Sequence, residues 1–118
     1  MPRAAIALVV ATLCGCSSPV TVLEEGLEIT IEPEAFLLHN RDFGVPLHYA
    51  IVETRASALI DLAPCETWST MVQPRSFALV PFDEVIGYDD DAESAWVWWC
   101  AVDDGEPIAG GSAEVDFP

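Results

Sequence analysis

Apolar and polar residues alternate with a period of two in several short segments of the chain. The alternation is clearest in residues 27–31, 47–53 and 112–117. Because successive side chains of a strand point to opposite faces of a sheet, this pattern predicts strands with one buried face. Three shorter apolar runs are also expected to be strands: residues 36–38, 58–62 and 77–80. A turn-rich connector follows the first at residues 40–44, and Pro64 and Pro81 close the other two.

Residues 95–102 are apolar at both sets of alternating positions. One set comprises Trp96, Trp98, Cys100 and Val102, and the other comprises Ala95, Val97, Trp99 and Ala101. Such a strand is expected at the centre of a sheet, with both faces covered at least in part. We assign Trp96 and Trp98 to the hydrophobic core and Trp99 to the more exposed face. The following Asp103-Asp104-Gly105 predicts a hairpin turn into the last strand.

About seven short strands, spaced by roughly 8–12 residues, predict an all-β sandwich. The one competing helical window, residues 83–86, is long enough for a single turn. The arrangement resembles an immunoglobulin- or fibronectin-like sandwich over about residues 27–117. The resemblance concerns the architecture and not the sequence motif. The immunoglobulin pattern places its Trp about a dozen residues after the first Cys, whereas Trp68 follows Cys65 by three residues.

The N-terminal segment has the composition of a signal peptide. Arg3 precedes residues 4–13, which are uncharged, mostly apolar and shorter than the ~20 residues that span a bilayer. The run Leu13-Cys14-Gly15-Cys16 then resembles the lipobox of bacterial lipoprotein signal peptides. The resemblance implies a diacylglyceryl group on the Cys16 thiol, cleavage after Gly15 and acylation of the new amine. Two or three acyl chains would hold the protein stably on a membrane.

This interpretation divides the chain into a signal peptide (1–15), a lipidated tether (16–26) and a β-sandwich domain (27–118). Ser17 after the cysteine resembles the sorting signal of outer-membrane lipoproteins. We therefore expect an outer-membrane location that faces the periplasm or the exterior. Cys14 leaves open cleavage by the ordinary signal peptidase, so that secretion is the alternative.

The charge restricts the class of partner. The chain has 20 acidic residues, four Arg and no Lys, and without Arg3 its formal charge is −17. Binding to nucleic acid is excluded, because phosphate contacts need clustered Lys and Arg. A basic envelope protein is a possible partner, and the alternative is a solvating surface that resembles those of salt-adapted organisms.

Cysteine usage predicts one disulfide. Cys14 is lost with the leader and Cys16 is acylated, which leaves Cys65 and Cys100. An exported domain with two remaining cysteines is expected to pair them. A metal site at these cysteines is not expected, because the chain has no CxxC motif and both histidines lie far from them in the sequence.

The tryptophans are the most conspicuous candidates for recognition. Trp99 and Trp68 could form an exposed surface that stacks on sugar rings beside carboxylates. The acidic run 89–93 is expected to be a solvated loop, with cation binding left open. His39 and His48 lie nine residues apart, and no catalytic, cofactor-binding or metal-binding motif is recognisable.

These observations predict a lipid-anchored, extracytoplasmic binding or scaffolding domain that is not an enzyme and needs no cofactor. The first alternative is an inhibitor or decoy for a cationic cell-wall enzyme, which the acidic surface would attract. The second is a carbohydrate-binding module, which requires Trp99 or Trp68 to be exposed.

Overall fold

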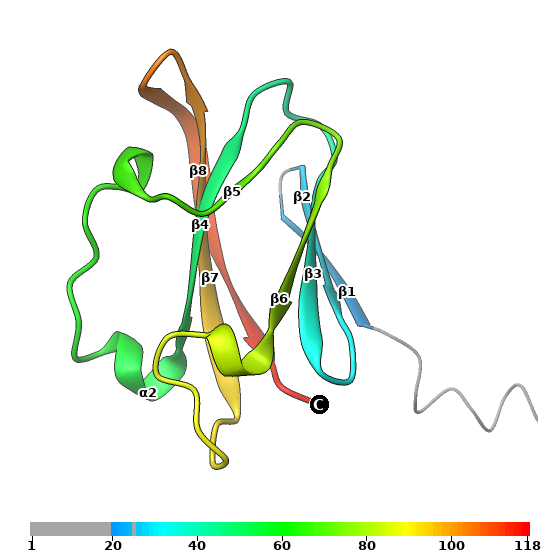
Figure 1. Ribbon diagram of the computed structural model, residues 1–118, viewed down its shortest axis with the longest axis vertical. Coiled ribbons are helices and arrows are strands. Elements are labelled where there is room, and N and C mark those ends of the chain that lie inside the picture. The colour runs from blue at the N-terminus through cyan, green and yellow to red at the C-terminus, as the bar shows by residue number, and fades with distance from the viewer. Residues whose placement is uncertain (1–19, 25) are drawn as a thin grey trace, which may run out of the picture.

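Two antiparallel four-stranded sheets pack face to face in the computed structural model, which describes residues 20–24 and 26–118 (Figure 1). The first sheet has the order β1 (Val20–Glu24), β2 (Leu27–Ile31), β3 (Ala35–Asn40) and β6 (Phe77–Pro81). The second has the order β5 (Met71–Val72), β4 (Leu47–Glu53), β7 (Ser94–Asp103) and β8 (Glu106–Asp116). The predicted all-β sandwich is therefore confirmed. The expected acylation site, Cys16, lies outside the described residues.

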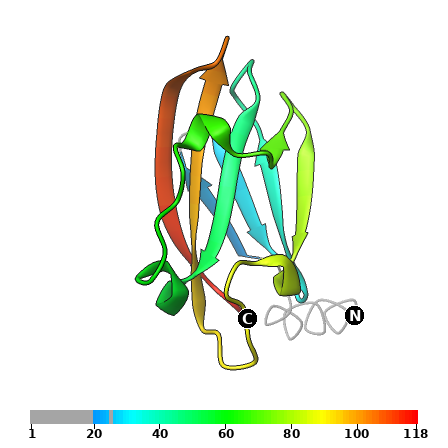
Figure 2. The ribbon, with the colours of Figure 1, turned by 60° about the vertical axis from the view of Figure 1, so that its left-hand side comes forward.

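The chain passes repeatedly between the two sheets. The connections from β3 to β4, from β5 to β6 and from β6 to β7 each join strands of different sheets. Neighbouring strands β7 and β8 instead form a hairpin at the predicted Asp-Asp-Gly turn, where Asp104 and Gly105 have positive φ angles of 53° and 81°. Figure 2 shows that this hairpin extends beyond the other strands at one end of the sandwich.

Two expectations about individual segments were wrong. The sandwich begins at Val20 rather than at residue 27, because β1 pairs with β2 inside the segment expected to be a tether. Residues 58–62 are not a strand. The chain turns at the short helix α2 (Thr54–Ser57), which Glu53 caps, and then leaves the sheet. The apolar residue Leu59 is consequently 85% exposed.

The core lies between the sheets and is rich in aromatic rings. Phe36 of β3 lies 4.9 Å from Phe82 and 5.3 Å from Phe117, measured between ring centroids. Phe82 belongs to the 3-10 helix η3 (Phe82–Glu84), which overlaps the one-turn helical window at residues 83–86. The last residues of the chain and the β6–β7 connection thus close the same end of the core.

The two faces of β7 are the reverse of the expected ones. Trp99 is 2% exposed and lies on the inner face, where its ring centroid is 5.5 Å from that of Phe43. Trp96 and Trp98 lie on the outer face, partly exposed, with nearly parallel rings 6.3 Å apart. Alternation separates the two sets of residues but does not say which set meets the other sheet.

The outer face of β7 is partly covered by the β4–β5 connection. Cys100 faces outward and forms the predicted disulfide with Cys65 of the 3-10 helix η2 (Cys65–Thr67), so the bridge does not join the two sheets. The bond closes a separation of 35 residues, which corresponds to about 4 kcal/mol in the chain-entropy model. It holds the β4–β5 connection against the sheet.

Because Trp99 fills the core, we expect Trp99→Ala to lower the free energy of unfolding by about 3–5 kcal/mol, as measured by urea denaturation. Trp98→Ala should cost clearly less, because its ring is partly exposed. Trp99→Phe is the control for ring burial. The Trp99 Nε1–H has no acceptor among the described residues, so that this substitution removes no hydrogen bond. It keeps most of the packing and should cost less than Trp99→Ala. An equal loss for Trp98→Ala and Trp99→Ala would contradict this face assignment.

Candidate binding cleft

The edge of β4 is only partly covered by other strands. β5 pairs with β4 at Leu47 and His48. One further backbone hydrogen bond follows, in which the Tyr49 N–H donates to the Thr70 carbonyl at 3.1 Å. Among the described residues, the β4–β5 connection makes no backbone hydrogen bond to β4 before Thr70, and its 3-10 helix η2 ends at Thr67. Strand pairing along this edge therefore stops after Tyr49.

The edge of β4 is covered again further along by the segment after η3. The Ile86 N–H donates to the Ile51 carbonyl at 3.0 Å, and the Glu53 N–H donates to the Ile86 carbonyl at 2.8 Å. The Ile51 N–H points to the same side of β4, because alternate residues of a strand direct their backbone groups alike. No residue in the described part of the chain accepts a hydrogen bond from it. A backbone donor is thus left in the gap.

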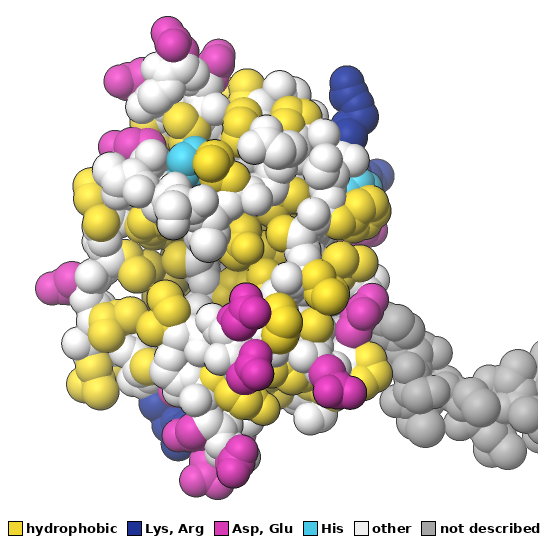
Figure 3. Space-filling view, viewed as in Figure 1, with side chains coloured by type: hydrophobic (Ala, Val, Ile, Leu, Met, Phe, Trp, Pro, Cys, Tyr) yellow, Lys and Arg dark blue, Asp and Glu magenta, His cyan; other side chains and the backbone are white. Residues whose placement is uncertain are grey.

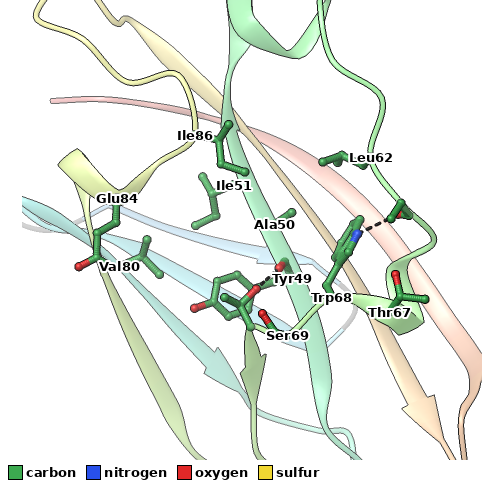
Figure 4. A pocket seen from close by; sticks show the side chains of 12 residues that line it. Tyr49, Ala50, Ile51, Leu62, Thr67, Trp68, Ser69, Val80, Glu84 and Ile86 are labelled. Carbon is green, nitrogen blue, oxygen red and sulfur yellow. Dashed lines mark hydrogen bonds between the residues drawn. The ribbon is translucent and has the colours of Figure 1, made fainter.

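A cleft of about 450 Å³ lies at this gap. In Figure 4, Leu62 and Trp68 lie on one side of β4, whereas Val80 and Glu84 lie on the other. Figure 3 shows hydrophobic side chains gathered in the hollow between β4 and β6, with acidic side chains near its lower border. The cleft is therefore mostly apolar with a negatively charged rim, which is typical of a site that binds by contact area and few polar groups.

Trp68 is held in place from two directions. Its Nε1–H donates to the Ala63 carbonyl at 2.8 Å, and its own carbonyl accepts a hydrogen bond from His48 Nδ1 at 2.8 Å. The neighbouring disulfide of Cys65 fixes the same segment to β7. The aromatic wall of the cleft is therefore preorganised rather than dependent on a ligand.

The polar groups of the cleft favour a positively charged ligand. Of the described residues that line it, Glu84 has the one charged side chain. Burial of the Tyr49 ring and the nearby carboxylate of Glu84 raise the pKa of the Tyr49 hydroxyl above its ordinary value. This hydroxyl is consequently protonated at neutral pH. Two aromatic walls, an apolar floor and one carboxylate suit an organic cation with an apolar stem.

A buried carboxylate supports one end of the cleft. Glu53 accepts hydrogen bonds from Arg55 Nε at 2.8 Å and from the Ala56 N–H at 3.0 Å, and Arg55 also donates to Asp89 at 2.8 Å. Gly87, with φ 80°, passes so close to α2 that a Cβ there would collide with the Ala56 side chain. These contacts dock the segment after η3 onto α2 and so position Ile86 at the edge of β4.

The structure separates several residues that the sequence analysis singled out. Trp68 lines the cleft, but Trp99 is buried and cannot form the expected binding surface with it. His39 lies in the first sheet, stacked on Phe77 at 4.1 Å, and His48 lies in the second. Within the described residues no group of His, Cys, Asp and Glu is arranged to hold a metal ion.

Sequence patterns did not single out Tyr49 or Glu84 for the site. Tyr49 is one of the alternating apolar residues of a predicted strand, and Glu84 is one acidic residue among 20. No motif connects them, because they meet only where β4 and η3 come together. The signal that could have pointed here is the acidic turn at 83–86 directly after an apolar strand.

No protein-family model, curated protein or solved structure matches this chain. None of the helices in the described part of the chain is long and apolar enough to cross a membrane.

The Glu53 network predicts acid sensitivity. Burial acts to raise the pKa of Glu53, but its hydrogen bonds from Arg55 and Ala56 outweigh burial and lower the pKa below its ordinary value of 4.5. A hydrogen bond from Arg55 also lowers the pKa of Asp89. Groups with a lowered folded-state pKa stabilise the fold above their unfolded-state pKa, and this stabilisation is lost as the pH falls through the folded-state pKa.

We therefore expect the urea midpoint of the wild type to fall as the pH is lowered from neutral to below 4.5. Glu53→Gln should be less stable at neutral pH and should lose less on acidification. Arg55→Met, which removes the cation while the carboxylates stay, should also flatten the profile. A Glu53→Gln profile parallel to that of the wild type would disprove this role of Glu53.

Proposed function

We propose that this protein is a lipid-anchored, extracytoplasmic binding domain of the bacterial envelope that acts by binding rather than by catalysis. The observation that carries the binding role is the preorganised apolar cleft at the edge of β4, with Trp68 and Tyr49 as walls and Glu84 at its rim. The lipobox-like run that ends at Cys16 supports the anchor.

The cleft suits a lysine-type side chain of a basic partner. The aromatic rings of Trp68 and Tyr49 can contact the aliphatic stem, and each ring attracts an ammonium group by about 0.5–2 kcal/mol. The carboxylate of Glu84 can pair with the ammonium group, while the Ile51 N–H can donate to a peptide carbonyl of the same partner.

The charge of the whole domain acts in the same direction. A formal charge of −17 would speed the encounter with a cationic partner, and salt would weaken this attraction. An inhibitor or decoy for a cationic cell-wall enzyme is one form of this function, because such an enzyme presents basic side chains to an acidic surface.

The test is a titration of the purified protein with the peptide tetralysine at low and high ionic strength, followed by tryptophan fluorescence. We expect saturable binding that salt weakens. Glu84→Gln should weaken it roughly five- to tenfold, which corresponds to about 1–1.4 kcal/mol. The matched control is Glu106→Gln, the same substitution at the exposed β7–β8 hairpin, which removes the same charge outside the cleft.

Three results would decide against this site. Absence of tetralysine binding would remove the proposed ligand class. Equal effects of Glu84→Gln and Glu106→Gln would show that only net charge matters. Binding of a neutral oligosaccharide instead of tetralysine would favour the carbohydrate-binding alternative, which would then use Trp96 and Trp98 beside Glu114 on the outer face.

The anchor is tested separately by mass. We expect the protein extracted from bacterial membranes to begin at Cys16 and to carry fatty acids, as measured by intact mass spectrometry. Cys16→Ser should yield a chain without fatty acids. A wild-type chain that carries no fatty acid and begins at another residue would contradict the lipid anchor and favour secretion.

A further inference from the structure

Strand β6 is an edge of the first sheet and pairs with β3 on one side only. The Asn40 N–H donates to the Ser76 carbonyl at 3.1 Å, and Leu38 lies opposite Ala78. Even-numbered residues of β6 therefore direct their backbone groups toward β3, and odd-numbered residues direct them away. The N–H and carbonyl groups of Phe77 and Leu79 consequently have no partner within the described residues. In Figure 2, β6 forms one margin of the molecule.

The same two residues also expose large apolar side chains. Phe77 and Leu79 are each 59% exposed on the outer face of the sheet. Leu79 lies directly opposite Leu37 of β3, and Phe77 is stacked on His39. An edge strand that combines unpaired backbone groups with exposed apolar side chains is a template for pairing with another strand.

We propose that β6 is a self-association edge, at which β6 of a second copy of this chain pairs antiparallel with it. Placing Phe77 opposite Leu79 of the second copy, and Leu79 opposite its Phe77, satisfies every unpaired group of these residues in both copies. The two-fold axis then passes beside Ala78. Phe77 and Leu79 of the two copies come together on one face across the new pair, so that part of their exposed apolar surface is buried.

The charges at the two ends of β6 select a second copy over other partners. Arg75 precedes the strand, and Asp83 and Glu84 follow it. Antiparallel pairing brings the start of one β6 beside the end of the other, so that the turn with Arg75 lies near the 3-10 helix η3 of the second copy, which carries Asp83 and Glu84. A uniformly basic strand from another protein would place positive charge next to Arg75, and a uniformly acidic strand would place negative charge next to Asp83. A second copy of β6 in antiparallel orientation places its acidic end next to Arg75 and its basic end next to Asp83.

Net charge opposes this association and determines its salt dependence. Two acidic copies repel each other over long distances, and salt screens this repulsion, whereas backbone pairing and apolar contact persist. The dimer should therefore become tighter as salt is raised from about 0.05 M to about 0.5 M. Binding of a basic peptide at the cleft has the opposite salt dependence, so that the two proposals are separable.

Sedimentation equilibrium of the full protein in a density-matched non-ionic detergent tests the dimer. Leu79→Lys should raise the dissociation constant about tenfold or more, because a charge on an edge strand opposes pairing. The matched control is Leu23→Lys, which changes a leucine of similar exposure, 56%, on β1 at the other edge of the same sheet. The control should dimerise like the wild type.

A charge exchange and hydrogen exchange locate the contact. Arg75→Asp should weaken the dimer, and combining it with Asp83→Arg should restore it. The amide protons of Phe77 and Leu79 should exchange more slowly as protein concentration rises. A monomer at every salt and protein concentration, or a dimer that Leu23→Lys disrupts and Leu79→Lys leaves intact, would overturn the proposal.

Discussion

The structure depends on the covering of β7, which is complete on most of its inner face and partial on its outer face. On the inner face Trp99 joins the hydrophobic core, and on the outer face Cys100 holds the β4–β5 connection through the disulfide. β7 also pairs with β4 and β8 along nearly its whole length. The packing of a buried ring such as that of Trp99 contributes most to stability when the surrounding structure is rigid, and the strands on either side of β7 make it rigid. The position of Trp68, and hence one wall of the cleft, follows from this arrangement.

The proposed functional surfaces both arise where strand pairing ends. The cleft lies at the edge of β4 between Thr70 and Ile86, and the self-association edge is the unpaired side of β6. Both positions retain backbone groups without a partner among the described residues, next to apolar side chains. A sandwich that leaves its sheets open on one side must manage such edges, and this chain places charged residues beside them.

Charge acts locally although the whole molecule is acidic. Arg55 lies between the carboxylates of Glu53 and Asp89, and it stabilises the docking of the β6–β7 connection onto α2. Arg75 is the basic end of β6, opposed at the other end by Asp83 and Glu84. The acidic surface elsewhere sets solubility and the sign of long-range attraction.

The sequence by itself determined the sandwich, most of its strands and the disulfide, because these follow from local alternation, turn residues and the number of cysteines. It also indicated that both faces of β7 would be covered at least in part, and the outer face is covered only in part. Only the tertiary structure decided which face of β7 is the core, because a period of two separates Trp98 from Trp99 without saying where the second sheet lies. The cleft was likewise beyond sequence, since Tyr49, Trp68 and Glu84 belong to segments that meet only when the sheets pack.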